Sequence, residues 1–292
     1  MQGKKKISPY LYLIPAFLIL FIFKFYPIFK TFAMAFYTKF DYLTDTVFET
    51  GTDNFEFVLK DEEFYLAVRN SIIYAIISVP LGITVGLFFA ILLNSIKRFA
   101  KFFRSIYFLP FVTSSAAVSI IWRWMLNKDY GIVNDILVFF HVSRVDWMGN
   151  PAKTLPILIL LSIWKGLGYK IIVLLASLQN VDENLIKQSK IDGANSFERI
   201  RYVILPTLKP SIIFLAITGL IGSLKIFDEV YIMYQQKPGP LQSGLTMVYY
   251  VFTKFYRYWE FGNASAAAVL LFFIIVIVTL LQVIFIRLRR DE

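Results

Sequence analysis

The segment ASAAAVLLFFIIVIVTLLQVIFI at residues 264–286 contains no charged side chain and sets the class of this protein. A helix rises about 1.5 Å per residue, so roughly 20 apolar residues cross the hydrocarbon core of a bilayer. Nearer the N-terminus, five more stretches are long and apolar enough, at residues 10–36, 70–94, 105–126, 154–178 and 207–227. We therefore expect an all-α integral membrane protein with six transmembrane helices.

The composition supports this class and excludes others. Of the 292 residues, 58% are hydrophobic and only 17% are charged, unlike the polar composition of a disordered chain. The chain has no cysteine and a single histidine, His141, so we expect no disulfide scaffold, no metal site and no histidine-based catalytic site. On a membrane protein the net charge of +10 indicates topology, and we expect no nucleic-acid partner.

Lysine and arginine concentrate in every second loop of the predicted bundle. They cluster at both termini and in two loops between them, at residues 4–6, 95–104, 179–210 and 287–290, whereas the first intervening loop is acidic. By the positive-inside rule, both termini and these two loops lie in the cytoplasm. We expect residues 10–36 to stay as an uncleaved helix, because their apolar run is too long for a signal peptide.

Four lysines fall inside the predicted spans, namely Lys24, Lys165, Lys170 and Lys225. A charge in the bilayer is costly unless it faces protein or water, or reaches the interface along its own stem. These lysines therefore indicate either a wet interior pathway or side chains that snorkel beside kinks made by prolines and glycines. Both interpretations remain open at the level of the sequence.

The cytoplasmic loop 180–206 has a definite pattern that predicts two short helices joined by a turn. Asp182 is a plausible N-cap, Gly193 can take the left-handed conformation that ends the first helix, Ser196 can cap the second, and Pro206 is expected to stop it. Such an element can dock on a cytoplasmic partner or lie on lipid as an interfacial helix. The second helix has one apolar face, made of Phe197, Ile200, Val203 and Ile204.

This loop resembles the signature of binding-protein-dependent ABC importer permeases, which is Glu-Ala-Ala, three residues, Gly, nine residues, Ile-x-Leu-Pro. Lys187-Gln188-Ser189 stands where Glu-Ala-Ala is usual and Val203 replaces Ile, so a salt bridge of the usual Glu is not carried over. The resemblance implies that the loop couples the permease to an ATPase. The residues it assigns to this coupling are Lys187, Asp192, Gly193, Ala194, Phe197, Val203, Leu205 and Pro206.

Further stretches extend the resemblance over residues 9–286. Arg104–Pro110 and Ile121–Asn127 resemble the second cytoplasmic loop and third helix of the family. The stretches that are similar to its carbohydrate-uptake branch are Asp146-Trp147, Ile163–Tyr169, Phe227–Gly239 and Gly262–Ala266. The implied fold is the type I ABC importer permease fold. Residues 1–69 would hold the N-terminus, first helix and acidic loop, 70–286 the transmembrane core, and 287–292 a basic cytoplasmic tail.

The resemblance implies a permease subunit in the inner membrane of a bacterium or archaeon that imports a sugar or oligosaccharide, with a polyol or glycerol-3-phosphate as the alternative substrate. The implied partners are a second permease chain, which in this branch usually forms a heterodimer with the first, a dimer of ATP-binding subunits, an extracytoplasmic substrate-binding protein and membrane lipid. No Gly-x4-Gly-Lys-Ser/Thr motif occurs, so ATP and Mg are expected on the partner ATPase. We expect no cofactor and no catalytic residue on this chain.

A sugar site needs aromatic platforms and a few hydrogen-bonding groups. Candidates between the fourth, fifth and sixth spans are Trp164, Lys165, Tyr169, Lys225 and Asp228. Alternatively, the aromatic residues belong to an interfacial belt, and Lys225 and Asp228 form an i,i+3 ion pair.

Two other functions remain open from the residues alone. A secondary transporter or channel would require carboxylates within the membrane, for which Asp228 and Glu229, at a helix end, are the only candidates. A membrane scaffold that recruits a cytoplasmic partner through loop 180–206 would tolerate neutral residues at Lys165 and Lys225.

Overall fold

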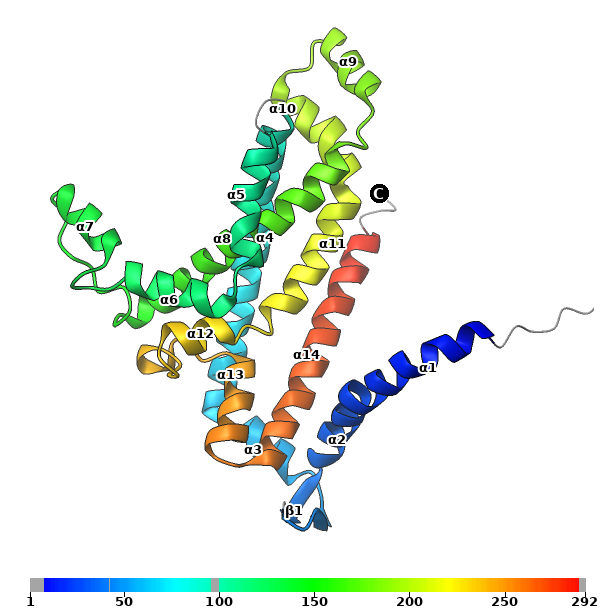
Figure 1. The fold of residues 1–292 in the computed structure, drawn as a ribbon, viewed down its shortest axis with the longest axis vertical. Coiled ribbons are helices and arrows are strands. Elements are labelled where there is room, and N and C mark those ends of the chain that lie inside the picture. The colour runs from blue at the N-terminus through cyan, green and yellow to red at the C-terminus, as the bar shows by residue number, and fades with distance from the viewer. Residues whose placement is uncertain (1–7, 42, 96–99, 289–292) are drawn as a thin grey trace, which may run out of the picture. The chain divides into compact units, whose positions relative to one another are not determined.

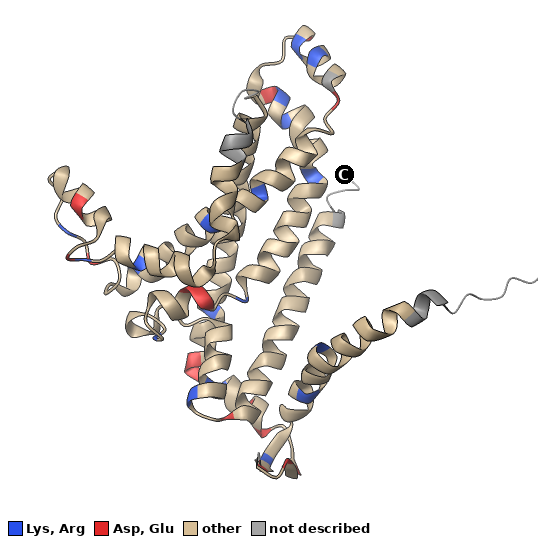
Figure 2. Cartoon of the chain, viewed as in Figure 1, with Lys and Arg blue, Asp and Glu red and all other residues tan. Residues whose placement is uncertain are grey.

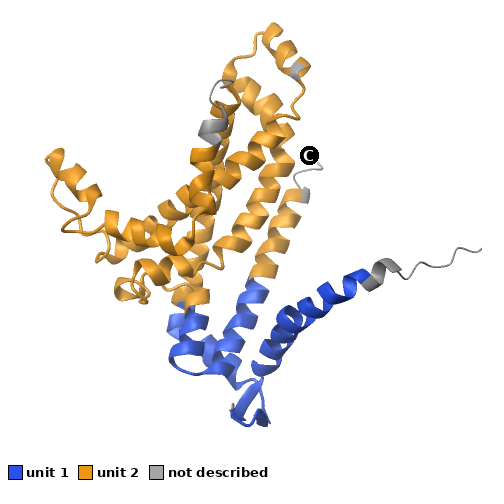
Figure 3. Cartoon of the chain, in the orientation of Figure 1, with its two compact units in different colours: residues 1–65, 250–274 blue, residues 66–249, 275–292 orange. Residues whose placement is uncertain are grey.

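The computed structural model of the protein describes residues 8–41, 43–95 and 100–288 (Figure 1). The chain forms two compact units. The first comprises residues 1–65 and 250–274, and the second comprises residues 66–249 and 275–292 (Figure 3). Helices dominate both units, as the apolar composition predicts.

The first unit begins with a single apolar span, Tyr12–Met34, of which no part is buried within the chain. It consists of α1 (Ser8–Leu20), a π-helical turn η1 (Phe21–Phe25) and α2 (Tyr26–Met34). Lys24 lies in the π-helical turn and is exposed. The span confirms the first predicted helix.

An antiparallel hairpin follows this span, in a loop for which the sequence predicted no strand. Strands β1 (Tyr37–Asp41) and β2 (Thr46–Thr50) pair with Phe40 opposite Val47, and α3 (Asp53–Lys60) comes next. Asn54 of α3 donates hydrogen bonds from its Nδ2 to the carbonyl oxygens of Ala35 and Tyr37, at 3.0 and 2.9 Å. These bonds hold the start of the hairpin against α3.

A cluster of largely buried charges joins residues 57–61 to residues 250–254 within the first unit. The Asp61 carboxylate accepts a hydrogen bond from the Tyr250 hydroxyl at 2.8 Å and lies 3.0 Å from the Lys254 ammonium. Burial raises the pKa of the Asp61 carboxyl, but the hydrogen bonds from Tyr250, Lys254 and the Glu63 amide outweigh burial and hold that pKa below its usual range. The Lys254 ammonium also lies 4.8 Å from the ring centre of Phe57.

Long helices reproduce most of the other predicted spans. These are α4 (Glu62–Ser95), α8 (Pro151–Leu178), α11 (Leu205–Ser223) and α14 (Phe261–Leu288). Among the described residues, five unbroken candidate spans and one bent pair of helices confirm the expectation of six crossings when the bent pair is taken as one.

The bent pair corrects the prediction of one continuous helix at residues 105–126. The chain instead forms α5 (Ala100–Val112) and α6 (Ser115–Met125), and their apolar parts meet at 103°. Pro110 cannot donate a main-chain hydrogen bond near the end of α5, and Ser114 has an extended ψ of 134° that ends the helical path.

The predicted boundaries of the fifth span are also wrong. α10 (Ser196–Arg199), the π-helical turn η2 (Ile200–Ile204) and α11 run as one helix, so Pro206 does not stop it. Pro206 lies in the first turn of α11, and the π-helical turn before it widens the backbone where the proline ring would otherwise clash. The helix ends at Ser223, which leaves Lys225 in the connection to α12 (Asp228–Met233).

The core of the second unit lies where α4, α8 and α11 pack together. Ile83, Ile171, Leu174 and Leu215 are among its buried side chains. α5 approaches α8 so closely that a Cβ atom at Gly168 would lie 2.2 Å from a main-chain oxygen of α5.

The shorter elements of the two units are α7 (Ile132–Phe139), α9 (Glu183–Ile191), η3 (Pro240–Gln242), α13 (Met247–Phe252) and η4 (Thr253–Arg257).

Candidate functional site

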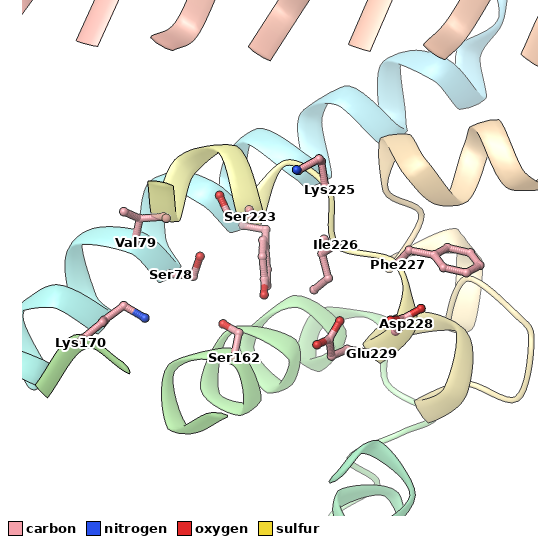
Figure 4. A pocket seen from close by; sticks show the side chains of 13 residues that line it. Ser78, Val79, Ser162, Lys170, Ser223, Lys225, Ile226, Phe227, Asp228 and Glu229 are labelled. Carbon is pink, nitrogen blue, oxygen red and sulfur yellow. The ribbon is translucent and has the colours of Figure 1, made fainter. Parts of the chain in front are cut away.

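A polar cavity of about 320 Å³ lies in the second unit, between α4, α8, α11 and the connection from α11 to α12 (Figure 4). Hydroxyl groups and charges line it, although the surrounding helices are apolar. The polar side chains are Tyr74, Ser78, Ser162, Lys170, Ser223, Lys225, Asp228 and Glu229. Such a lining gives hydrogen-bond donors and acceptors between helices that are otherwise mainly apolar.

Side-chain hydrogen bonds from α4 hold the wall of this cavity in place. Asn70 donates to the carbonyl oxygen of Leu245 at 3.0 Å, and Ser71 accepts from the Met247 amide at 2.9 Å. Thr246, which lies between Leu245 and Met247 in the chain, donates to the carbonyl oxygen of Ile226 at 2.9 Å. The connection that precedes α12 is therefore tied through segment 245–247 to α4.

Lys165 is not a free cation of the pathway, because it joins three helices. Its ammonium lies 3.2 Å from the carboxylate of Glu229 in α12, and each side chain is 17% exposed. It also donates a hydrogen bond to the Ser115 hydroxyl in the first turn of α6. Glu229 lies in the first turn of α12, where a negative charge is favourable.

The five predicted pathway residues divide into separate groups. Lys225 and Asp228 line the polar cavity, and the described residues contain no ion pair between them. Trp164 instead packs against Trp122, with ring centres 5.8 Å apart, and lines an apolar hollow of about 650 Å³. Tyr169 stacks on a phenylalanine of α5. Neither aromatic residue belongs to the lining of the polar cavity.

Several lining residues were missed as site candidates, although the sequence contains a signal for some of them. Tyr74 and Ser78 follow Asn70 at intervals of four residues in a largely apolar helix, so the three form one polar stripe along α4, of which Tyr74 and Ser78 line the cavity. The sequence places Lys170 within a predicted span but gives no sign that it lines a cavity. Ser162 and Ser223 give no local signal.

The turn of loop 180–206 has the predicted geometry with one correction. Asp182 caps α9 by accepting from the Asn184 amide at 2.8 Å, and Gly193 has the left-handed φ of +80°. The N-cap of α10 is Asn195 rather than Ser196, because Asn195 and Glu198 form a reciprocal capping box.

The apolar residues of this loop point in two directions. Val203 and Ile204 pack against the core of the second unit, whereas the side chain of Phe197 is 68% exposed. Ile191, at the end of α9, is 84% exposed. The loop therefore presents two large apolar residues on either side of the Gly193 turn.

Basic residues lie on the same two helices as these exposed apolar side chains (Figure 2). Lys187 and Lys190 belong to α9, and Arg199 donates from its guanidinium to the carbonyl oxygen of Ala194 at 2.7 Å. Several of the other predicted cytoplasmic cations, namely Lys4, Lys5, Lys6, Lys97, Arg98, Arg289 and Arg290, lie outside the described residues.

Sequence comparison relates the chain to membrane transport proteins. Residues 82–291 match the family described as binding-protein-dependent transport system inner membrane component. The lactose transport system permease protein LacF of Rhizobium radiobacter is 33% identical over 255 residues, which cover 86% of this chain and 84% of the relative. The arabinooligosaccharides transport system permease protein AraP of Bacillus subtilis (strain 168) is 33% identical over 264 residues, with 90% and 83% covered. The trehalose/maltose transport system permease protein MalF of Thermococcus litoralis is 28% identical, with 97% and 94% covered.

Structural comparison finds the same fold in a solved transporter. A chain of a bacterial ABC transporter involved in the import of the acidic polysaccharide alginate matches with a TM-score of 0.84 and 24% identity. The match covers 95% of this chain and 94% of that one. It confirms the predicted fold class.

Proposed function

Because this chain belongs to the family of binding-protein-dependent transport system inner membrane components, we propose that it is the permease subunit of an ATP-driven importer of a sugar or oligosaccharide. Relatives named for lactose, arabinooligosaccharides and trehalose/maltose support a saccharide as the substrate. A polyol or glycerol-3-phosphate is the alternative substrate for the same function. The protein would lie in the cell membrane of a bacterium or archaeon.

The polar cavity is the observation that carries this proposal. Its volume of about 320 Å³ is at the lower end of ligand pockets, which span roughly 300–1,000 Å³. A sugar exposes a ring of hydroxyl groups, and the serine hydroxyls, carboxylates and ammonium groups of the lining can pair with them. Lys225 and Asp228 are therefore retained as substrate contacts, and Lys165 becomes a positioning residue for Glu229.

Transport would be driven from the cytoplasmic loop. ATP and Mg would bind to a separate ATPase dimer, and the loop would receive its movement through Phe197 and Ile191, which the chain leaves exposed. α10, η2 and α11 form one helix, so a displacement of the loop reaches Ser223 at the cavity wall without a break. ATP binding and substrate binding would then bias the same conformational equilibrium.

The remaining partners follow from the type of importer. A second permease chain would complete the translocation pathway, and an extracytoplasmic binding protein would deliver the sugar. Lys187 replaces the glutamate that is usual in this loop, so the ATPase surface that meets it would carry a different charge pattern.

Affinity purification from the native membrane in a mild detergent tests this proposal. We expect an ATPase and a second six-span permease to co-elute with the wild-type chain. Phe197→Asp should lose the ATPase and keep the second permease, because it places a charge in an apolar contact. Phe139→Asp is a matched control, since Phe139 is 78% exposed on α7, in a loop predicted to be extracytoplasmic. A wild-type chain that elutes alone in several detergents would contradict the proposal and favour a secondary transporter or a scaffold.

A further inference from the structure

Lys170 enters the polar cavity through a slot that three glycines leave open. A Cβ atom at Gly86 would lie 2.9 Å from the Cβ of Lys170, and one at Gly82 would lie 3.1 Å from its Cε. A Cβ atom at Gly166, on α8 itself, would lie 2.8 Å from its Nζ. Side chains are therefore missing from α4 and α8 along the length of this lysine, and any larger residue at these glycines would have to displace it.

The ammonium group of Lys170 has no partner in the described part of the chain. No hydrogen bond or ion pair joins it to another described residue, although it lies within a membrane-spanning helix. The buried lysines Lys165 and Lys254, in contrast, are each paired with a carboxylate. An unpaired cation inside a membrane protein is costly, which points to a partner that comes from outside the chain.

The charges of the cavity are arranged unevenly along it. Figure 4 shows the Lys170 side chain at one side of the lining, which Ser78 and Ser162 also share, and the carboxylates of Asp228 and Glu229 at the other side. Lys165 already neutralises Glu229. The Lys170 side of the cavity is therefore cationic, whereas the opposite side carries the two carboxylates, and the lining also includes Lys225 and several hydroxyl groups.

We propose that Lys170 makes the cavity select a sugar that carries a carboxylate or phosphate group. The anionic group would bind at Lys170, beside Ser78 and Ser162, and the hydroxyl groups of the sugar would donate to Asp228 and Glu229. A charge-assisted hydrogen bond between ammonium and anion is about twice as strong as a neutral one, so a neutral sugar would leave the lysine poorly compensated. This inference rests on the proposed sugar import and narrows its substrate class.

Uptake by the complete importer, assembled with its co-purified partners in proteoliposomes, tests this inference. The probes are neutral disaccharides and trisaccharides, the uronic-acid sugars of the same length, and sugar phosphates. We expect the wild-type importer to take up at least one anionic sugar. Lys170→Met and Lys170→Gln should each lower that uptake about tenfold or more, and change uptake of any neutral sugar less than about twofold. The two anionic probe types identify whether the carboxylate or the phosphate is the group recognised.

The matched control is Lys153→Met, which removes the same charge from the same helix outside the cavity. It should change neither kind of uptake more than about twofold. Import of neutral sugars alone, or an equal loss of both kinds in the Lys170 variants, would overturn the inference and leave sugar import standing. Unchanged anion uptake in Lys170→Gln would overturn it as well, because the charge would then have no role. If no probe is imported although the ATPase co-purifies, the sugar assignment fails, and this inference fails with it.

Discussion

Neutralising one member of the Lys165–Glu229 pair should lower the stability of the second unit more than neutralising one member of an exposed ion pair. The pair joins α8 to α12, and Lys165 also binds the Ser115 hydroxyl of α6. In Glu229→Gln the ammonium would keep only the neutral hydroxyl and amide groups near it. In Lys165→Met the carboxylate would lose its cation in a largely buried position.

The structure sets the size of the effect. At the observed 3.2 Å, and with an effective dielectric constant of about 20, the attraction is about 5 kcal/mol. The desolvation of each ion offsets several kcal/mol of this, so the intact pair contributes little net stability. Removal of one partner leaves an uncompensated buried charge, and since each side chain is 17% exposed we expect a loss of about 3 kcal/mol for either single variant.

A double-mutant cycle measures this coupling directly. The free energy of unfolding would be obtained by denaturant titration in mixed micelles for the wild type, Lys165→Met, Glu229→Gln and the double variant. We expect the double variant to be more stable than the two single losses predict when added, with a coupling energy of about 2 kcal/mol or more.

The Arg144–Asp135 pair supplies the matched control for this cycle. Its nitrogen and oxygen atoms are closer, at 2.8 Å, but its side chains are 39% and 56% exposed. Solvent screens such a pair, so its cycle should give only about 0.2–1 kcal/mol. If the coupling of Lys165 with Glu229 is no larger than that of the control, the reasoning from burial is refuted.

Three more predictions follow from single positions. Gly193→Pro should abolish uptake and leave membrane insertion intact, because proline cannot adopt the φ of +80°, and normal uptake would contradict the coupling role of the turn. Gly168→Ala should lower the free energy of unfolding by about 1–3 kcal/mol, because its Cβ atom would lie 2.2 Å from a main-chain oxygen of α5, whereas Gly222→Ala, with no atom within 4 Å of its Cβ, should not. Hydrogen bonds hold the pKa of Asp61 below its unfolded value despite burial, so its contribution is present above about pH 4 and is lost as the pH falls through the folded pKa. The difference in unfolding free energy between wild type and Asp61→Asn should therefore shrink below about pH 4, and a difference that does not change with pH would exclude this role.

The membrane-spanning helices and the turn of loop 180–206 could be predicted because their causes are local. An apolar run such as residues 264–286 needs no distant partner to be recognised as a span. The Asp182 cap and the left-handed Gly193 depend on residues within one helical turn. The predicted cap at Ser196 differs from the observed cap, Asn195, by only one residue. Asparagine caps a helix as well as serine does, and Glu198 completes the capping box with Asn195.

The lining of the cavity, in contrast, depends on packing between distant segments. Lys165 and Glu229 are 64 residues apart, and nothing near either of them in the chain indicates that they meet. Trp164 and Lys170 both lie on α8, yet one faces an apolar hollow and the other the polar cavity. The sequence alone therefore determines the length and polarity of the spans and the capping of the loop helices, because these depend on neighbouring residues. The site depends on the tertiary packing that brings α4, α8, α11 and α12 around one cavity.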